Sequence, residues 1–126
     1  MEFRGYKELE CYKKARELRI FVAVLIKKLP SIENFLLRSQ ITDSSRSVSA
    51  NIVEGYGRFT YADTRNFFII ARGSNLETME HMQIAFDEGY ISEKELETGS
   101  QLCEHVFRLI NGYINYLNKQ KSNKTP

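Results

Sequence analysis

The stretch CYKKARELRIFVAVLIKKL, residues 11–29, decides the fold. Its apolar side chains recur every three or four residues, which is the spacing of an amphipathic helix with one buried face. The positions on this face are Cys11, Ala15, Leu18, Val22, Leu25 and Leu29. The same pattern returns near the end of the chain at Cys103, Val106, Ile110, Tyr113 and Leu117. This spacing is typical of the seam of a helical bundle.

Residues that start or stop helices divide the chain into four segments. In chain order they are Pro30, a Ser31 N-cap, Gly55 and Gly57, the pair Thr60 and Asp63, Gly89, and the pair Ser92 and Glu95. The helices are therefore expected at about 7–29, 32–56, 61–88 and 93–119. Short connections place consecutive helices antiparallel. We predict one all-α domain over residues 1–120, an antiparallel up-down four-helix bundle, and a flexible tail over residues 121–126.

Composition agrees with a small globular protein. The chain has 126 residues, a formal charge of +2 and 42% hydrophobic residues, so it can bury a core without disulfides or metals. Cys11 and Cys103 fall at inward positions and are expected to be buried, reduced thiols. The N-terminus lacks the apolar segment of a secretory signal, and the apolar run Ile20–Ile26 is far shorter than the roughly 20 residues of a membrane span. A cytoplasmic protein without a membrane contact is expected.

No residue constellation predicts catalysis or metal binding. A di-iron bundle needs Glu-x-x-His units, but Thr78 and Leu102 stand three residues before His81 and His105. We therefore expect no metal, no cofactor and no enzymatic activity. Glycines inside the predicted helices, Gly73 and Gly112, are interpreted as points where backbones approach closely.

Polar residues interrupt the apolar faces of the second and third helices. Asn51 and Glu54 lie among Val and Ile residues, and Arg72 and Glu77 do so on the next helix. A buried carboxylate is costly unless it is paired, so we predict that Asn51, Glu54, Arg72 and Glu77 form a hydrogen-bonded network that fixes helix register. The alternative is a polar pocket, which an enzyme could build around Glu54, Arg72 and Glu77.

The corner between the second and third helices combines arginines with aromatic rings. Arg58, Phe59, Tyr61 and Arg65 lie within eight residues of one another. Bases stack on exposed rings while guanidinium groups hold phosphates, and the start of a helix attracts anions. These four residues are candidates for nucleic-acid binding. The alternative is that Tyr56, Phe59 and Tyr61 plug the end of the bundle.

Two of the predicted helices carry apolar stripes wider than one seam. The additional positions are Ile20, Phe21, Val24 and Ile26 on the first helix, and Leu102, Phe107, Leu109, Ile114 and Tyr116 on the fourth. Large exposed apolar patches usually mark interfaces. We therefore expect self-association, with a merely broad core as the alternative.

Two stretches resemble a known protein family. They are SVSANIVEGYGR, residues 47–58, and a second signature with Phe67, IARGS at residues 70–74, and Glu77. Together they are similar to the four-helix-bundle proteins encoded in intervening sequences of bacterial 23S ribosomal RNA genes. The similarity extends from Leu9 to about Leu117. Relatives of this family include the accessory variability protein of diversity-generating retroelements.

The resemblance implies a ring-like homopentamer without established enzymatic activity. For the retroelement relative it implies binding of nucleic acid and of a reverse transcriptase through a basic surface. The family often has a basic pair after the glutamine of the second helix, where this chain has Thr42 and Asp43; Arg46 lies about one turn away and joins the candidates. We expect an oligomeric module that binds RNA or an RNA-handling protein. The alternative is a protein–protein scaffold without a nucleic-acid role.

Overall fold

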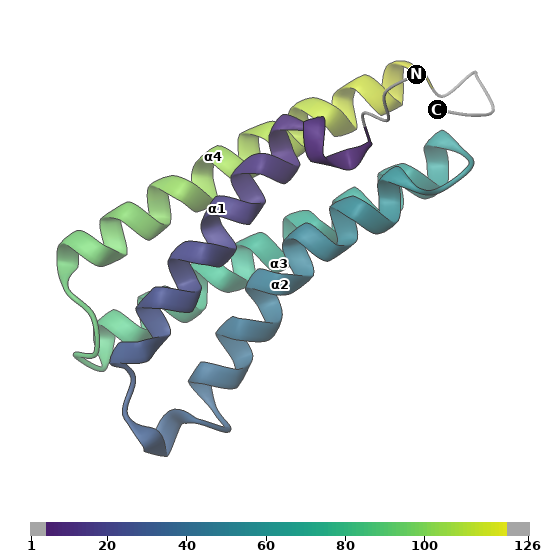
Figure 1. Cartoon of the computed structure of the whole chain (residues 1–126). Coiled ribbons are helices and arrows are strands. Elements are labelled where there is room, and N and C mark those ends of the chain that lie inside the picture. Colours follow the sequence, from purple (N-terminus) through teal and green to yellow (C-terminus); the bar gives the residue numbers. More distant parts are fainter. Residues whose placement is uncertain (1–4, 121–126) are drawn as a thin grey trace.

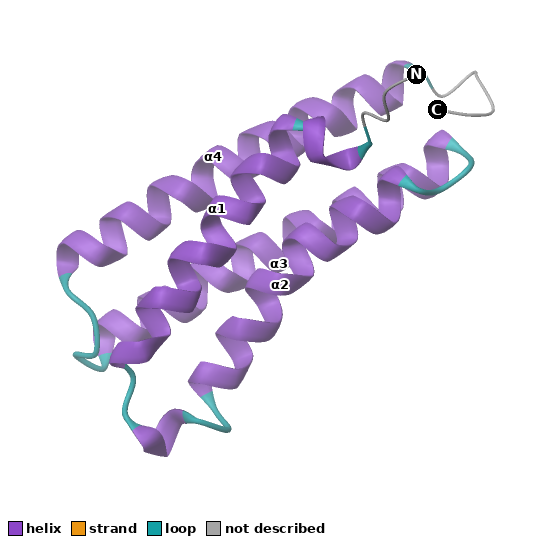
Figure 2. Cartoon of the chain, in the orientation of Figure 1, coloured by secondary structure: helices purple, strands orange, loops and turns teal. Residues whose placement is uncertain are grey.

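The fold is a four-helix bundle, seen in a computed structural model that describes residues 5–120 (Figures 1 and 2). Consecutive helices run antiparallel, and α1 and α3 each pack against both α2 and α4. No strand occurs between residues 5 and 120. The prediction of an all-α bundle is confirmed. The helices are α1 Glu10–Leu25, α2 Leu37–Tyr56, α3 Tyr61–Asp87 and α4 Glu93–Lys119, with 3₁₀ turns at Tyr6–Glu8, Ile26–Lys28 and Ser31–Glu33.

The starts of α3 and α4 follow the capping signals in the sequence. The Thr60 hydroxyl accepts a hydrogen bond from the backbone N–H of Asp63 at 3.2 Å. Ser92 and Glu95 form a complete capping box, in which each side chain accepts from the other residue's N–H. Gly89 follows α3 with a φ of 82°, a left-handed conformation that favours glycine. The expected bounds of these two helices agree with the structure within one residue.

The second helix begins later than its sequence predicts. Ser31 opens only a short 3₁₀ turn and its side chain caps nothing, so the predicted start at residue 32 is wrong. The carboxylate of Glu33 instead accepts from the N–H of Leu37 at 3.2 Å, and α2 starts there. The Tyr90 hydroxyl donates to the other oxygen of Glu33 at 2.8 Å. A tertiary contact from the α3–α4 connection therefore helps to hold this start.

The core lies between the four helices and contains the predicted seams. All six seam positions of the first helical segment are buried, as are Cys103, Val106, Ile110 and Leu117 on α4. Burial raises the pKa of the Cys11 thiol to about 11 and that of Cys103 to about 12, so both side chains are inert thiols at neutral pH. Phe68 is the largest fully buried side chain, and its ring stacks on Tyr113.

Glycine permits close helix contacts at two positions. A Cβ atom on Gly55 would lie 3.0 Å from the Cβ of Phe67 and from the ring of Phe68, so α2 and α3 can meet here only without a side chain. Gly99 likewise faces the Met82 side chain on α3. In contrast, a Cβ on Gly73 or Gly112 would meet no atom within 4 Å. The interpretation of these two glycines as close approaches within the chain is therefore wrong.

Candidate nucleic-acid interface

The corner between α2 and α3 exposes an aromatic ring but little free positive charge. Phe59 is 76% exposed. The Arg58 guanidinium lies 2.8 Å from the carboxylate of Glu54 and 4.5 Å from the centre of the Phe67 ring. Arg65 donates to the side-chain oxygen of Asn118 on α4 at 3.0 Å. Both predicted phosphate ligands of the corner thus already have protein partners.

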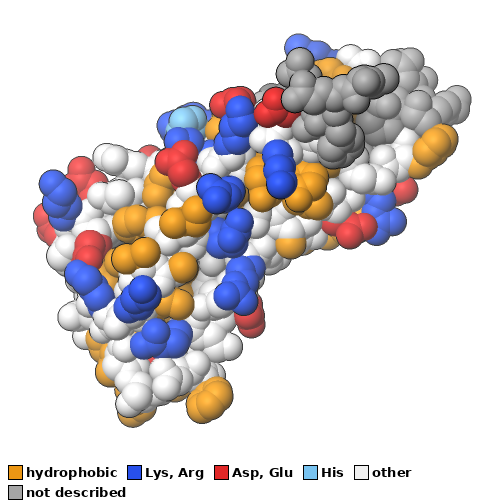
Figure 3. All heavy atoms as spheres, in the orientation of Figure 1, with side chains coloured by type: hydrophobic (Ala, Val, Ile, Leu, Met, Phe, Trp, Pro, Cys, Tyr) orange, Lys and Arg blue, Asp and Glu red, His pale blue; other side chains and the backbone are white. Residues whose placement is uncertain are grey.

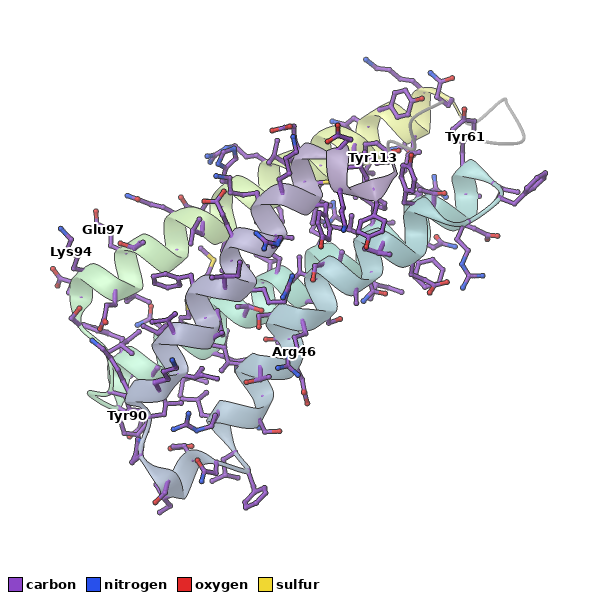
Figure 4. The ribbon with its side chains drawn as sticks, in the orientation of Figure 1. Arg46, Tyr61, Tyr90, Lys94, Glu97 and Tyr113 are labelled. Carbon is purple, nitrogen blue, oxygen red and sulfur yellow. The ribbon has the colours of Figure 1, made fainter. Side chains whose placement is uncertain are left out.

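A cavity of about 710 Å³ opens beside this corner, between the end of α2, the start of α3 and the last turns of α4. Its lining consists of Tyr56, Gly57, Arg58, Phe59, Thr64, Tyr113 and Tyr116. Tyr61 points from the start of α3 toward the end of α4 (Figure 4). Tyr56 and Phe59 line the opening without filling it, because both remain exposed. The alternative in which the aromatic residues plug the end of the bundle does not describe this structure.

The tyrosine hydroxyls at this end influence one another. Burial, together with smaller contributions from the nearby Tyr116, Cys11, Tyr56 and Tyr61, raises the pKa of Tyr113 to about 12. Desolvation and the charge and hydrogen bond of Tyr116 raise the pKa of Tyr61. The phenols of Tyr61 and Tyr113 are therefore neutral at physiological pH, when each can donate as well as accept a hydrogen bond.

Arg46 lies away from the corner, on α2 facing α1 (Figure 4). Together with Arg19 it borders a groove of about 150 Å³ between the two helices. The floor is apolar and includes Ile20, Ala23 and Ile26. The structure therefore separates Arg46 from the other four candidates of the sequence analysis.

Two basic side chains border this groove, and two more lie on the same segment of the chain as Arg19. The side chains of Arg16, Arg19, Lys27 and Arg46 form no ion pair or hydrogen bond with any residue between 5 and 120. Figure 3 shows a band of Lys and Arg side chains over the face that α1 and α2 form. We call the four residues the basic face. Arg16, Arg19 and Lys27 were not identified in the sequence analysis, although their spacing of three and eight residues along the first predicted helix, 7–29, was a signal that could have found them.

The prediction that Asn51, Glu54, Arg72 and Glu77 form one hydrogen-bonded network is wrong. The side-chain amide of Asn51 donates to the backbone oxygen and the hydroxyl of Ser47, both at 2.9 Å, and Ser47 bonds Ser74 at 2.8 Å. Glu54 turns to solvent and pairs with Arg58. The remaining two members also point elsewhere: Arg72 donates to Asn111 at 2.7 Å, and the exposed Glu77 lies 3.8 Å from His81.

The predicted members point in different directions because α3 packs against two helices, α2 and α4. Its Ser74 and Thr78 bond Ser47 and Ser44 on α2, whereas Arg65 and Arg72 bond Asn118 and Asn111 on α4. The side of α3 that carries Arg72 therefore never meets Glu54. The pocket around Glu54, Arg72 and Glu77 that the catalytic alternative needed does not form.

Among residues 5–120, no group of three or more His, Cys, Asp and Glu side chains is placed to hold a metal ion. Within the same range no helix is both long enough and apolar enough to cross a membrane.

Comparisons with known proteins agree with the two sequence signatures. The family model described as 23S rRNA-intervening sequence protein matches residues 7–112. A crystal structure of a protein with unknown function, from the S23 ribosomal protein family of Bacteroides thetaiotaomicron VPI-5482, superposes with a TM-score of 0.77 at 25% sequence identity. The match covers 82% of this chain and 97% of that one. No curated protein matches. The chain belongs to the 23S rRNA-intervening sequence protein family.

Proposed function

We propose that this protein is a non-enzymatic, self-associating cytoplasmic module that binds single-stranded RNA through its basic face. The observation that carries the proposal is a set of four cationic side chains that have no partner within residues 5–120, namely Arg16, Arg19, Lys27 and Arg46. Cations without carboxylate partners can neutralise phosphates without first breaking an ion pair. The nearest acidic residues weaken the face only in part, because Glu17 is paired with Lys14 and Asp43 is a single exposed side chain.

Salt dependence is the property that tests this proposal. Each phosphate neutralised on a single strand contributes about 0.7 to the slope of log affinity against log salt, so four contacts per protomer give a slope of about 3. The double variant Arg19→Gln/Arg46→Gln is expected to flatten the slope by about 1.4. Fluorescence anisotropy with a labelled RNA between about 50 and 200 mM salt measures it.

The corner provides the matched control. Arg58→Gln/Arg65→Gln removes the same number of charges from guanidinium groups that already bind Glu54 and Asn118. We expect a smaller change in slope from this pair. Equal changes in the two double variants would contradict the assignment to the basic face. If the wild-type protein bound no RNA even at low salt, the proposal would fail and the scaffold alternative would take its place.

Self-association is best supported by the outer face of α3. Ile69, Ile70 and Leu76 are 40–51% exposed there, around the open Gly73. A glycine inside a helix costs about 1 kcal/mol relative to alanine, and no contact within the chain accounts for this one. We propose that a second copy packs against this surface, the α3 stripe, and that five copies assemble as the family resemblance implies.

The apolar stripes predicted on the first and fourth helices support self-association less well than the α3 stripe does. Ile114 is buried, and the other additional residues of α4 except Tyr116 are partly buried. Phe21 lies against the position of Gly99 and so belongs partly to the core. Only Ile20 and Val24 on α1 and Tyr116 on α4 stay exposed among these residues.

We expect Ile70→Asp/Leu76→Asp to convert the oligomer into monomers. Two charges on the α3 stripe would have to be desolvated at the interface, while in the monomer both positions already face water. Sedimentation velocity at micromolar concentration measures the change in mass. Val24→Asp on α1 is the control and should leave the oligomer intact. A wild-type protein that sediments as a monomer, or an oligomer that Val24→Asp alone breaks, would contradict this prediction.

A further inference from the structure

The cavity beside the α2–α3 corner differs from the basic face in both place and chemistry. Its volume of about 710 Å³ falls in the range of about 300–1,000 Å³ that is usual for sites of small organic ligands. Four of its seven lining residues are aromatic, namely Tyr56, Phe59, Tyr113 and Tyr116. No Asp or Glu side chain from the part of the chain that the structure describes lines it. Such a lining suits a flat, aromatic ligand more than a cation or an aliphatic chain.

The aromatic rings supply the stacking surface. Tyr113 is held rigidly, because one face of its ring stacks on the buried Phe68 at a centroid distance of 4.6 Å. Tyr116 lies next to it, with ring centres 5.5 Å apart and planes tilted by 43°. Across the opening, Tyr56 and Phe59 remain exposed and are free to cover a ligand.

Hydrogen-bonding groups and one cation complete the lining. The phenols of Tyr56, Tyr113 and Tyr116 can each donate or accept, so they can match either kind of group on the edge of a heterocycle. The Thr64 hydroxyl donates to the backbone oxygen of Thr60 at 3.0 Å and can still accept from a ligand. Arg58 lies at the rim, where its pairing with Glu54 leaves it exposed and only partly neutralised. Among residues 5–120, the only charged group of the lining is therefore positive, which favours a ligand that carries phosphate.

From this combination we infer that the cavity, here called the tyrosine pocket, binds a single unpaired nucleobase. Flat rings would hold the faces of the base, hydroxyl groups its edge, and Arg58 an attached phosphate. Since every base has an aromatic face, binding should tolerate all four bases and favour the larger purines. The inference does not require the RNA binding proposed above, because a free nucleotide is as good a ligand as a base within a strand.

The first test uses free ligands and the wild-type protein. The chain has no Trp and seven Tyr, of which Tyr56, Tyr113 and Tyr116 line the pocket, so a change in tyrosine emission can report binding there. Saturation-transfer NMR detects the bound ligand directly. Adenosine and adenosine monophosphate are expected to bind, the monophosphate more tightly, and uridine more weakly than adenosine. Ribose 5-phosphate, which lacks the base, should not bind measurably. If ribose 5-phosphate bound as well as the monophosphate, or if no nucleoside bound, the inference would be overturned.

The second test places the ligand in the tyrosine pocket. Tyr56→Ala/Tyr116→Ala removes two partly exposed rings and should weaken adenosine binding about 5- to 100-fold, the range expected for the loss of base stacking. Phe35→Ala, which removes an exposed ring outside the pocket, should change nothing. Thermal unfolding by circular dichroism verifies that both variants are folded. Unchanged adenosine affinity in the folded double variant would contradict the assignment.

Experiments with an RNA strand distinguish a base within a strand from a free nucleotide. They also distinguish the tyrosine pocket from the basic face. With a labelled single strand, the tyrosine variant should lower affinity while keeping the salt slope, whereas Arg19→Gln/Arg46→Gln should flatten the slope while keeping adenosine binding. An abasic strand should not respond to the tyrosine variant. Adenosine binding without any RNA binding would identify a free nucleotide as the ligand and would contradict only the proposed function. RNA binding that ignores the tyrosine variant, with no adenosine binding, would contradict only this inference.

Discussion

Phe68→Ala is expected to lower the free energy of unfolding by about 3–5 kcal/mol, the usual cost of truncating a buried phenylalanine. Phe68 has no exposed surface. Its ring touches the position of Gly55 on α2 and stacks on Tyr113 of α4, so it joins three helices. The rigid helices around it cannot collapse fully into the space, and the cavity adds to the lost burial.

Urea unfolding followed by circular dichroism measures this change. For a domain of this size the same loss lowers the melting temperature by roughly 10–20 °C. Phe59→Ala is the matched control, because that ring is exposed and should contribute less than about 0.5 kcal/mol. A Phe68 variant that is less than about 1 kcal/mol weaker than the wild type would show that the three helices do not depend on this contact.

The sequence carried enough information to predict the bundle. Apolar residues repeat with the helical period, and each helix needs one buried stripe, so the seam of α1 could be identified without coordinates. Ser92 and Glu95 act within four residues of each other, which makes their capping box a local property. The start of α2, in contrast, also depends on a residue that is distant in the sequence. The Glu33 carboxylate accepts from the first N–H of α2 and also from the Tyr90 hydroxyl. No local sequence pattern predicts this second contact, because the two residues are 57 positions apart.

The functional residues were harder to predict because their partners lie on other helices. Periodicity says which residues share a face, but it does not say which neighbour that face meets. Asn51 is linked to Ser74 through Ser47, because these side chains lie between α2 and α3. The side chain of α3 near Glu54 is Phe67, which has no group that can bond a carboxylate. Glu54 therefore stays in solvent, where it pairs with Arg58. The corner arginines looked free in the sequence for the same reason.

The outward-facing side of the third helix could not be identified from the sequence. Ile69, Ile70 and Leu76 alternate with buried positions closely enough to suggest a broad core. In the bundle only the seam through Phe68 and Ala71 is buried, and the α3 stripe faces outward. Three neighbours cannot cover every side of a helix, so a sequence with apolar residues all around it predicts some exposed surface without saying which side it is.

Asn75→Asp is expected to have the largest effect of any single isosteric change. Asn75 is fully buried on α3 and its amide nitrogen donates to the backbone carbonyl of Cys103 at 2.8 Å. Its side-chain oxygen, also buried, has no hydrogen-bond partner within residues 5–120. An ionised carboxylate here would have no donor and would face the Cys103 carbonyl oxygen. Fully buried carboxyl groups shift by up to about 3–5 pKa units, which corresponds to about 4–7 kcal/mol once the pH exceeds both pKa values, and to about 4 kcal/mol at neutral pH.

The pH dependence distinguishes this effect from a packing defect. Burial raises the folded-state pKa of the new carboxyl above its unfolded value, so the penalty is absent below the unfolded pKa. It grows as pH rises from that value to the folded pKa, and it is complete above both. At low pH the protonated carboxyl can again donate to Cys103. Urea unfolding of the variant and the wild type between about pH 4 and pH 8 should therefore diverge toward high pH; Asn75→Leu, which carries no charge, should show no such divergence. A variant that is unfolded at neutral pH and folds near pH 4 would be the extreme form of the expected result, and stability equal to wild type at pH 8 would show that this position is hydrated.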